Sequence, residues 1–409
     1  MVMKSVKLAS ILFYLNSVFV VSCFVSCGSS PTEASSLLTA DIRGGMDKPG
    51  LLGLGDEIKG VTFVPLEVTT DDASLIDGVY DYAVTDRYIY VLPVKEPRIV
   101  LFDRQGRFIR TLVKEGQGPG EFRGILPCIQ VDERNDRLFL FSNNRVWEYT
   151  LEGEFIGQST HEYSVIYMRH IGKDRFAAIS FPFQPFNGGG FGLGLFSRKG
   201  DTIAIKNDFY SFLLPHEKSG FTTSIASAYS DAQNSVLFKT GSNDTVFCIS
   251  ADRISAACVL DLKNSDAEVI RSLDVTDMSN LRIEKKDPKD IFVQDMIEFP
   301  AHYYFRLLYN QGYYIASVDK KTGKTLVEKC EMPGSIYELA DANLQHGMQG
   351  TRSYRNFPVW GRVIKDELVQ VVTPYELNLY KSLHSITIPQ ELDLKGEEGN
   401  PVFVFYSLI

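Results

Sequence analysis

The sequence has few of the features that mark nucleic-acid binding or metal chemistry. Its 42 Lys and Arg are outnumbered by 51 Asp and Glu, giving a formal net charge of −9, and no Lys/Arg-rich run is present. Because an acidic surface repels a phosphate backbone, nucleic acid is not an expected partner. The six His show no ligand spacing such as HxxxH, so no zinc site is predicted.

Signatures of common enzymes are also missing. The chain contains no GxSxG nucleophile elbow. It lacks the sialidase Ser-Asp-x-Gly-x-Thr-Trp box and the YWTD and WD signatures of other repeat proteins. We therefore predict no catalytic residues, and a non-enzymatic role is favoured.

Cysteine is too sparse for a disulfide framework. Beyond the first 30 residues only Cys128, Cys248, Cys258 and Cys330 remain. Cys248 and Cys258 flank a turn and are the one plausible pair, although buried free thiols are the favoured interpretation.

Long apolar runs are absent except at the N-terminus. There, Lys4 and Lys7 precede an apolar stretch from Leu8 to Val21, which has the length of a signal-peptide core. It is shorter than the roughly 20 residues of a membrane-spanning helix. Two segments that follow, ending in Cys23 and in Cys27, resemble the bacterial lipobox, in which the Cys is diacylated. Lipidation is predicted at Cys27 or Cys23, with an uncleaved anchor helix as the alternative.

This N-terminus predicts three regions and a cellular address. Residues 1–26 are the expected lipoprotein signal peptide, 27–58 a tether and N-terminal extension, and 59–409 one large domain. The lipid would attach the protein to a membrane of the cell envelope. Gly28 stands where an Asp would retain the protein at the inner membrane, which favours the outer membrane. Glu33 is the one acidic residue of the tether, which favours the periplasmic face over the surface.

A repeat of four strands runs through that domain. Gly106, Gly153 and Gly200 each end a polar turn between two alternating strands, at intervals of 47 residues. Further copies surround Asp252 and Gly323. Glycine at this position predicts a turn with positive φ. A second hairpin precedes each copy, and two hairpins per unit are typical of a propeller blade.

The predicted fold class is all-β, a six-bladed β-propeller of four-stranded antiparallel blades. The blades are expected near 75–115, 125–160, 165–208, 222–263, 298–332 and 357–408. Residues 263–298 are predicted to form a charged, partly helical insertion; seven blades is the alternative if that stretch hides a degenerate unit. The ring is expected to close through strand-like segments at 60–68 and 401–408, with the C-terminal segment completing blade six.

Two segments resemble a known family. The loop Gly116, Gly118, Pro119, Gly120, Glu121 and Phe122 resembles the GxGPGE(F/Y) loop of six-bladed propeller lipoproteins of Bacteroidetes, described as TolB-like or NHL-like. Residues 400–406 (NPVFVFY) resemble the closing strand of the same family. The resemblance implies a propeller fold and an envelope address, and no reaction. The glycine loop lacks the Lys-Ser/Thr of a P-loop and is interpreted as an inter-blade turn, not a phosphate cradle.

A binding site is expected at one end of the central channel, at the starts of the innermost strands and the loops between blades. The Tyr and Arg expected there suit a glycan, peptide or envelope protein, bound by a monomer. The candidate residues are Asp77, Tyr80, Arg123, Tyr167, Arg169, His302, Tyr303, Tyr354, Arg355 and Trp360.

The alternative function is a Ca²⁺-dependent hydrolase of the lactonase or esterase type, with Asp and Asn oxygens at the channel centre. No other cofactor is predicted. The Asp-rich hairpin turns are attributed to turn chemistry and not to a metal site. They contain Asp86, Asp132, Asp136, Asp174 and Asp366.

Overall fold

The computed structural model divides the chain into two compact units, Met1–Leu37 and Leu38–Ile409. The residues it describes are 37–50, 52, 57–124, 128–142, 144–161, 165–180, 183–184, 192–206, 212–213, 228–232, 235–239, 244–262, 291–310, 312–330, 362–374, 377 and 399–409. The predicted signal peptide and both candidate lipidation cysteines lie outside these residues. No helix in the described part of the chain is long and apolar enough to span a bilayer.

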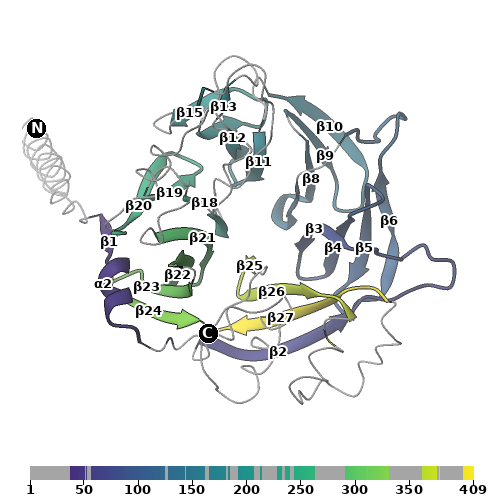
Figure 1. Ribbon diagram of the computed structural model, residues 1–409. Coiled ribbons are helices and arrows are strands. Elements are labelled where there is room, and N and C mark those ends of the chain that lie inside the picture. The colour runs from purple at the N-terminus through teal and green to yellow at the C-terminus, as the bar shows by residue number, and fades with distance from the viewer. Residues whose placement is uncertain are drawn as a thin grey trace, which may run out of the picture. The chain divides into compact units, whose positions relative to one another are not determined.

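Six four-stranded antiparallel blades surround a central channel, as the repeat predicts (Figure 1). Blade one contains β3 (Val79–Val84), β4 (Tyr88–Pro93), β5 (Arg98–Asp103) and β6 (Phe108–Lys114). Blade two contains β7 (Cys128–Asp132), β8 (Arg137–Ser142), β9 (Arg145–Tyr149) and β10 (Phe155–Thr160). Blade three contains β11 (Val165–His170), β12 (Arg175–Ser180), β14 (Leu193–Ser197) and β15 (Thr202–Lys206), beside a parallel pair of β13 (Phe183–Gln184) and β16 (Phe212–Leu213).

The second half of the ring follows the same plan. Blade four contains β17 (Ala228–Ala232), β18 (Ser235–Lys239), β19 (Thr245–Ser250) and β20 (Ile254–Leu260). Blade five contains β21 (Ile291–Glu298), β22 (His302–Tyr309), β23 (Gly312–Asp319) and β24 (Thr325–Cys330). Blade six contains β25 (Arg362–Ile364), β26 (Glu367–Val372), β27 (Val402–Leu408) and β2 (Ile58–Pro65). The six-bladed fold class is therefore confirmed, and the seven-bladed alternative is wrong.

Burial follows position within a blade. The middle strands β4 and β5 are almost wholly buried, because neighbouring blades cover both of their faces. The outermost strand β10 alternates between exposed and half-buried positions. The core therefore consists of apolar layers between blades, such as the cluster of blades one and two that contains Phe122 and Trp147.

The glycines of the repeated hairpins have the backbone conformation that the sequence predicts. Gly106, Gly153, Gly200 and Gly323 have φ of 81°, 88°, 97° and 73°. At Gly106 a Cβ would also lie 2.1 Å from the carbonyl oxygen of Pro65 in β2. This hairpin tip of blade one thus packs directly on the backbone of blade six.

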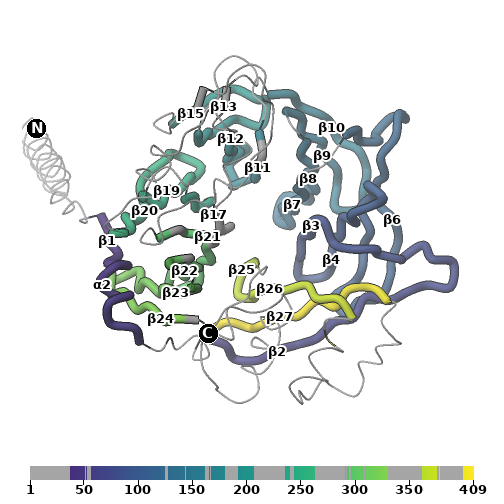
Figure 2. Tube along the Cα trace, viewed as in Figure 1, coloured from purple at the N-terminus to yellow at the C-terminus, as the bar shows by residue number. Residues whose placement is uncertain are grey.

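Both ends of the domain close the ring in one blade. β27 lies between β26 and β2, so the last blade takes three strands from the C-terminal end and its outermost strand from the N-terminal end. In Figure 2 the purple β2 and the yellow β27 run side by side. The predicted C-terminal strand completes blade six, and the segment near 60–68 supplies its outer edge.

The segment predicted as a tether contains ordered structure. β1 (Leu38–Ala40) pairs in parallel with β20 as a fifth strand of blade four. The helix α2 (Ile42–Asp47) follows, and Gly50 N–H then donates to the carbonyl oxygen of Val327 in blade five at 2.8 Å. We call residues 38–50 the N-terminal belt, because they run along the outer strands of blades four and five.

The boundary of the predicted insertion also differs. The charge pattern predicts an insertion over 263–298, whereas the last eight residues of this stretch form β21, the innermost strand of blade five. Residues 263–290 lie outside the described part of the chain. Cys128, Cys248 and Cys258 are free thiols, so no bridge joins Cys248 to Cys258.

Candidate functional site

A cavity of about 1160 Å³ lies at the channel end where innermost strands turn into second strands. Each of the six blades contributes to its lining. The contributing segments at the mouth are 85–86, 132–135, 172–173, 251–252, 298–300 and 365–366. The cavity is larger than many small-molecule sites and is built by residues far apart in the sequence.

The wall of this cavity is joined across four blades by buried polar contacts. Asp81 of blade one is 2% exposed, and its carboxylate accepts from Arg362 Nη2 of blade six at 2.5 Å. The same carboxylate accepts from the Ile129 N–H of blade two at 2.6 Å. The Ile129 carbonyl in turn accepts from Arg169 Nη1 of blade three at 2.6 Å. Both arginines line the cavity.

Tyrosine rings support both guanidinium groups. The Arg169 guanidinium lies 4.8 Å from the centroid of the Tyr167 ring, and its Nε donates to the Tyr167 hydroxyl at 2.5 Å. The Arg362 guanidinium lies 4.7 Å from the Tyr82 ring, and its Nη1 donates to the Tyr82 carbonyl at 3.0 Å. Burial raises the pKa of the Tyr82 hydroxyl. These contacts fix two positive charges in place at the channel wall.

Ion pairs between blades surround the mouth. Lys365 of blade six contacts Asp86 of blade one and Glu133 of blade two, the latter at 2.9 Å. Burial lowers the pKa of Lys365, but its hydrogen bonds to the two carboxylates outweigh this effect, and the net shift is upward. Lys173 of blade three pairs with Asp252 of blade four at 3.1 Å. Lys365 thus joins the hairpin tips of blades six, one and two, and the Asp86 N–H adds a hydrogen bond to Glu133 at 3.3 Å.

Burial shifts the pKa of two groups near the cavity that could in principle act as a nucleophile or an acid–base, Cys128 and His170. Burial raises the pKa of the Cys128 thiol to about 12, so it is not a thiolate near neutral pH. Burial lowers the pKa of His170, although Asp132 at 3.5 Å opposes the shift. The His170 ring stacks on Phe139 with centroids 4.8 Å apart. The described lining is therefore suited to hydrogen bonding and ion pairing with a ligand.

The structure brings only part of the predicted site together. Arg169 lines the cavity, and Tyr167 contacts it from the same strand. Asp77 and Tyr80 lie at the start of blade one, at the opposite end of its innermost strand. Tyr80 is 48% exposed in a bulge of β3, and Asp77 pairs with Lys95 at 3.7 Å.

The remaining predicted residues lie elsewhere. Arg123 follows β6 and donates to the carbonyl oxygen of Gly116 at 3.3 Å. His302 and Tyr303 begin β22, the second strand of blade five, because β21 precedes them as the innermost strand. His302 Nδ1 lies 3.0 Å from a carboxylate oxygen of Glu57. Tyr354, Arg355 and Trp360 lie outside the described residues.

Arg362 of the cavity wall and Asp81, which pairs with it, are not among the predicted site residues. Both are single charged residues in strand-like stretches, and only their meeting across blades reveals their role. A signal for the cavity itself was present in the hairpin turns. Asp132 ends the innermost strand of blade two, Asp86 and Asp366 follow those of blades one and six, and all three line the cavity mouth.

The glycine loop that carries the family resemblance lies between blades one and two. Glu121 accepts a hydrogen bond from the Gly118 N–H at 2.7 Å and lies so close to Gly116 that a Cβ there would be 1.8 Å from its carboxylate. Phe122 is fully buried, with its ring edge-on to Trp147. The described contacts of this loop are thus with the protein's own residues.

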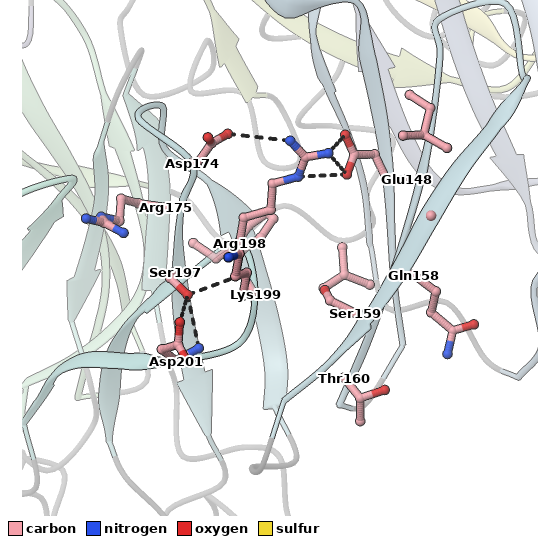
Figure 3. Close-up of a pocket in the computed structure, with 14 residues that line it drawn as sticks. Glu148, Gln158, Ser159, Thr160, Asp174, Arg175, Ser197, Arg198, Lys199 and Asp201 are labelled. Carbon is pink, nitrogen blue, oxygen red and sulfur yellow. Dashed lines mark hydrogen bonds and ion pairs between the residues drawn. The ribbon is translucent and has the colours of Figure 1, made fainter.

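A second pocket, of about 800 Å³, lies between blades two and three. Figure 3 shows the Arg198 guanidinium lying between Glu148 and Asp174, and its Nε donates to Glu148 at 2.9 Å. Ser197 donates to Asp201 at 2.8 Å. The channel cavity is larger and is lined by all six blades, so it is the stronger candidate for a ligand site.

The closed ring of six blades around a channel with a wide polar cavity defines the class of the protein, a six-bladed β-propeller. The chain belongs to the family called domain of unknown function DUF4934, whose model matches residues 37–407.

A solved structure shows the same fold. A crystal structure of a "Putative exported protein" from Bacteroides fragilis NCTC 9343 is similar, with a TM-score of 0.62 and 15% sequence identity, over 91% of this chain and 99% of that one. A chain of a nidogen/laminin complex matches with a TM-score of 0.34 and 9% identity, over 66% of this chain and 92% of that one. No curated protein sequence matches.

Proposed function

We propose that this protein is a non-catalytic binding or scaffold protein of the bacterial cell envelope that takes its ligand into the channel-end cavity. The observation that supports this most directly is a cavity of about 1160 Å³ lined by all six blades. The fixed guanidinium groups of Arg169 and Arg362 supply polar recognition at its wall. A glycan, peptide or envelope protein fits these properties.

The cellular location of the protein is part of the same proposal. The lipobox-like segments support lipidation at Cys27 or Cys23 and attachment to the outer membrane, with the propeller on the periplasmic face. The similar protein from Bacteroides fragilis is described as exported, which supports an envelope location. We propose that the protein acts as a monomer and needs no cofactor.

The experiment is a capture assay with the full chain in detergent, immobilised and exposed to solubilised envelope glycans, peptides and proteins. Ala251 lines the cavity mouth, and Ala251→Trp places a bulky ring there. Thr202→Trp adds the same ring to an exposed position of the outer strand β15 as a matched control. We expect captured material to be lost with Ala251→Trp and kept with Thr202→Trp. Equal capture by both variants would contradict the proposal.

The Ca²⁺-dependent hydrolase is not favoured by any observation. In the residues that the structure describes, no group of three or more His, Cys, Asp or Glu is placed to hold a metal ion.

A further inference from the structure

The outermost strand of each blade has an edge that pairs with no strand of its own blade. Such an edge offers backbone N–H and C=O groups to any extended chain, and proteins commonly protect it with lysine or proline. Among the six outermost strands that the structure describes, β2, β6, β15 and β24 each contain a lysine. β10 (FIGQST) and β20 (ISAACVL) contain neither a charged residue nor a proline. These two edges are therefore unprotected by their own sequence.

The edge of β20 is covered by another part of the chain. β1 adds to it as a fifth strand, with Leu38 opposite Cys258. The hairpin tip of the next blade rests on this added strand, because a Cβ at Gly323 would lie 3.4 Å from the carbonyl oxygen of Thr39. Among the described residues, β10 pairs with β9 alone, so its outer edge has no such cover. In this fold, an extended strand is thus the kind of partner that an unprotected edge accepts.

A groove runs along the outer edge of β10. It is the pocket of about 800 Å³ between blades two and three, and residues 156–160 all line it. In Figure 3 it lies between the strand that carries Gln158 and the hairpin that carries Arg198. This hairpin bounds one end of the groove, because a Cβ at Gly200 would lie 2.9 Å from the carbonyl oxygen of Thr160.

Gly157 leaves space within this groove. Its φ is not positive, and no described atom lies within 4 Å of the place where a Cβ would stand. The register shift against β9 at this point is therefore not the kind of bulge that needs a glycine. Glycine inside a strand can instead mark the close approach of another backbone. The neighbouring Ile156 is 41% exposed, so an arriving strand would also meet an apolar side chain.

We propose that β10 binds an extended peptide segment of a partner protein as a fifth strand of blade two. The main chain of the segment pairs with the outer edge of β10, and its alternate side chains pack beside Ile156 and over Gly157. Charge does not select this segment, because acidic and basic side chains are equal in number in the described lining. They are Glu148, Asp174 and Asp201, and Arg175, Arg198 and Lys199. We expect an uncharged segment rich in β-branched residues, which favour the extended backbone.

The test is calorimetric titration of the full chain in detergent with acetyl-Ser-Thr-Val-Thr-Val-Thr-Ser-amide and with the same peptide N-methylated at every residue. N-methylation removes the N–H donors of the peptide, so we expect the unmethylated form to bind at least tenfold more tightly. Its affinity should change less than threefold between low and high salt, because no excess charge lines the groove. Amide hydrogen exchange in residues 156–160 should slow when this peptide is bound.

Two glycine substitutions locate the binding. Gly157→Trp fills the groove at a position where a side chain has room, and it should weaken binding of the peptide at least tenfold. Gly60→Trp is the matched control, because Gly60 lies at a register shift of the outermost strand β2 and also has no described atom within 4 Å of a Cβ. It should change the affinity less than threefold. Ala251→Trp, in the channel-end cavity, should leave binding of the peptide unchanged.

Each outcome decides the inference. No binding of the peptide at millimolar concentration, equal binding of the two peptides, or equal effects of Gly157→Trp and Gly60→Trp would overturn it. If Gly157→Trp fails to fold, unchanged hydrogen exchange of residues 156–160 in the unaltered protein would overturn it as well. Binding that is lost in Ala251→Trp and kept in Gly157→Trp would place the peptide in the channel-end cavity. That result would reject the groove and support the proposed function.

Discussion

Asp81 is a buried charge whose contacts link blades one, two and six. Its side chain accepts from Arg362 at 2.5 Å, the Ile129 N–H at 2.6 Å and the Tyr82 N–H at 2.9 Å. Asp81→Ala removes all three acceptor contacts, including the carboxylate that pairs with the partly buried Arg362 guanidinium. Removal of one partner of a buried pair costs about 3–5 kcal/mol, so we expect the free energy of unfolding to fall by about that amount.

The assay is urea unfolding followed by the fluorescence of the two tryptophans, of which Trp147 lies between blades one and two. Asp77→Ala is the control, because Asp77 pairs at 3.7 Å with a Lys95 that is 80% exposed, and its loss should cost less than about 1 kcal/mol.

A second substitution tests the reason for the loss. If the cost of Asp81→Ala comes from the uncompensated charge, adding Arg362→Met should restore part of the lost stability. A loss for Asp81→Ala no larger than that for Asp77→Ala would refute the reasoning. A double variant whose loss equals the sum of the two single losses would refute it as well.

Three further results are expected from the same unfolding assay. Phe122→Ala should lower the free energy of unfolding by about 3–5 kcal/mol, because the ring is fully buried. Phe155→Ala, at a residue that is 46% exposed, should lower it by less than about 1 kcal/mol. Similar losses for the two variants would contradict the inter-blade role of the glycine loop. Gly106→Ala should lower the free energy of unfolding by at least about 2 kcal/mol, because φ is 81° and the new Cβ would clash with the carbonyl oxygen of Pro65. No change would show that the backbone of blade six moves to make room for the Cβ. Burial lowers the pKa of His161 to about 4, so its neutral ring adds about 3 kcal/mol to the free energy of unfolding above pH 6.5, and this is lost as pH falls towards 4. His161→Phe should therefore make the free energy of unfolding less dependent on pH between 6.5 and 4. An unchanged dependence on pH would contradict this prediction.

The blade architecture could be predicted because each blade repeats a local pattern. Alternating strands and the turns at Gly106, Gly153 and Gly200 are encoded in neighbouring residues, and these determine the hairpins without reference to the rest of the chain. The belt could not be predicted in the same way. β1 is three residues long, and its only described ladder is with β20, more than 200 residues away.

The cavity wall was harder to predict for the same physical reason. Asp81, Ile129, Arg169 and Arg362 lie on four blades, so no local spacing reports their contacts. Arg169 was selected from its place on an innermost strand, and it does line the cavity. The site is expected at the starts of the innermost strands, whereas the cavity lies where these strands end, beside the Asp-rich hairpins that are attributed to turn chemistry. Such residues can form a turn and the mouth of a cavity at once.

The order of contacts at the start of the domain determines how the molecule would respond to force. A pull on the N-terminus acts first on the three-residue ladder of β1 with β20, and then on the contacts of α2 and Gly50 with blade five. Only after these does tension reach β2, whose seven paired residues close the ring against β27. The N-terminal belt therefore takes the load before the β2–β27 pairing that closes the ring. When β1 separates from β20 under force, the four strands of each of the six blades remain paired.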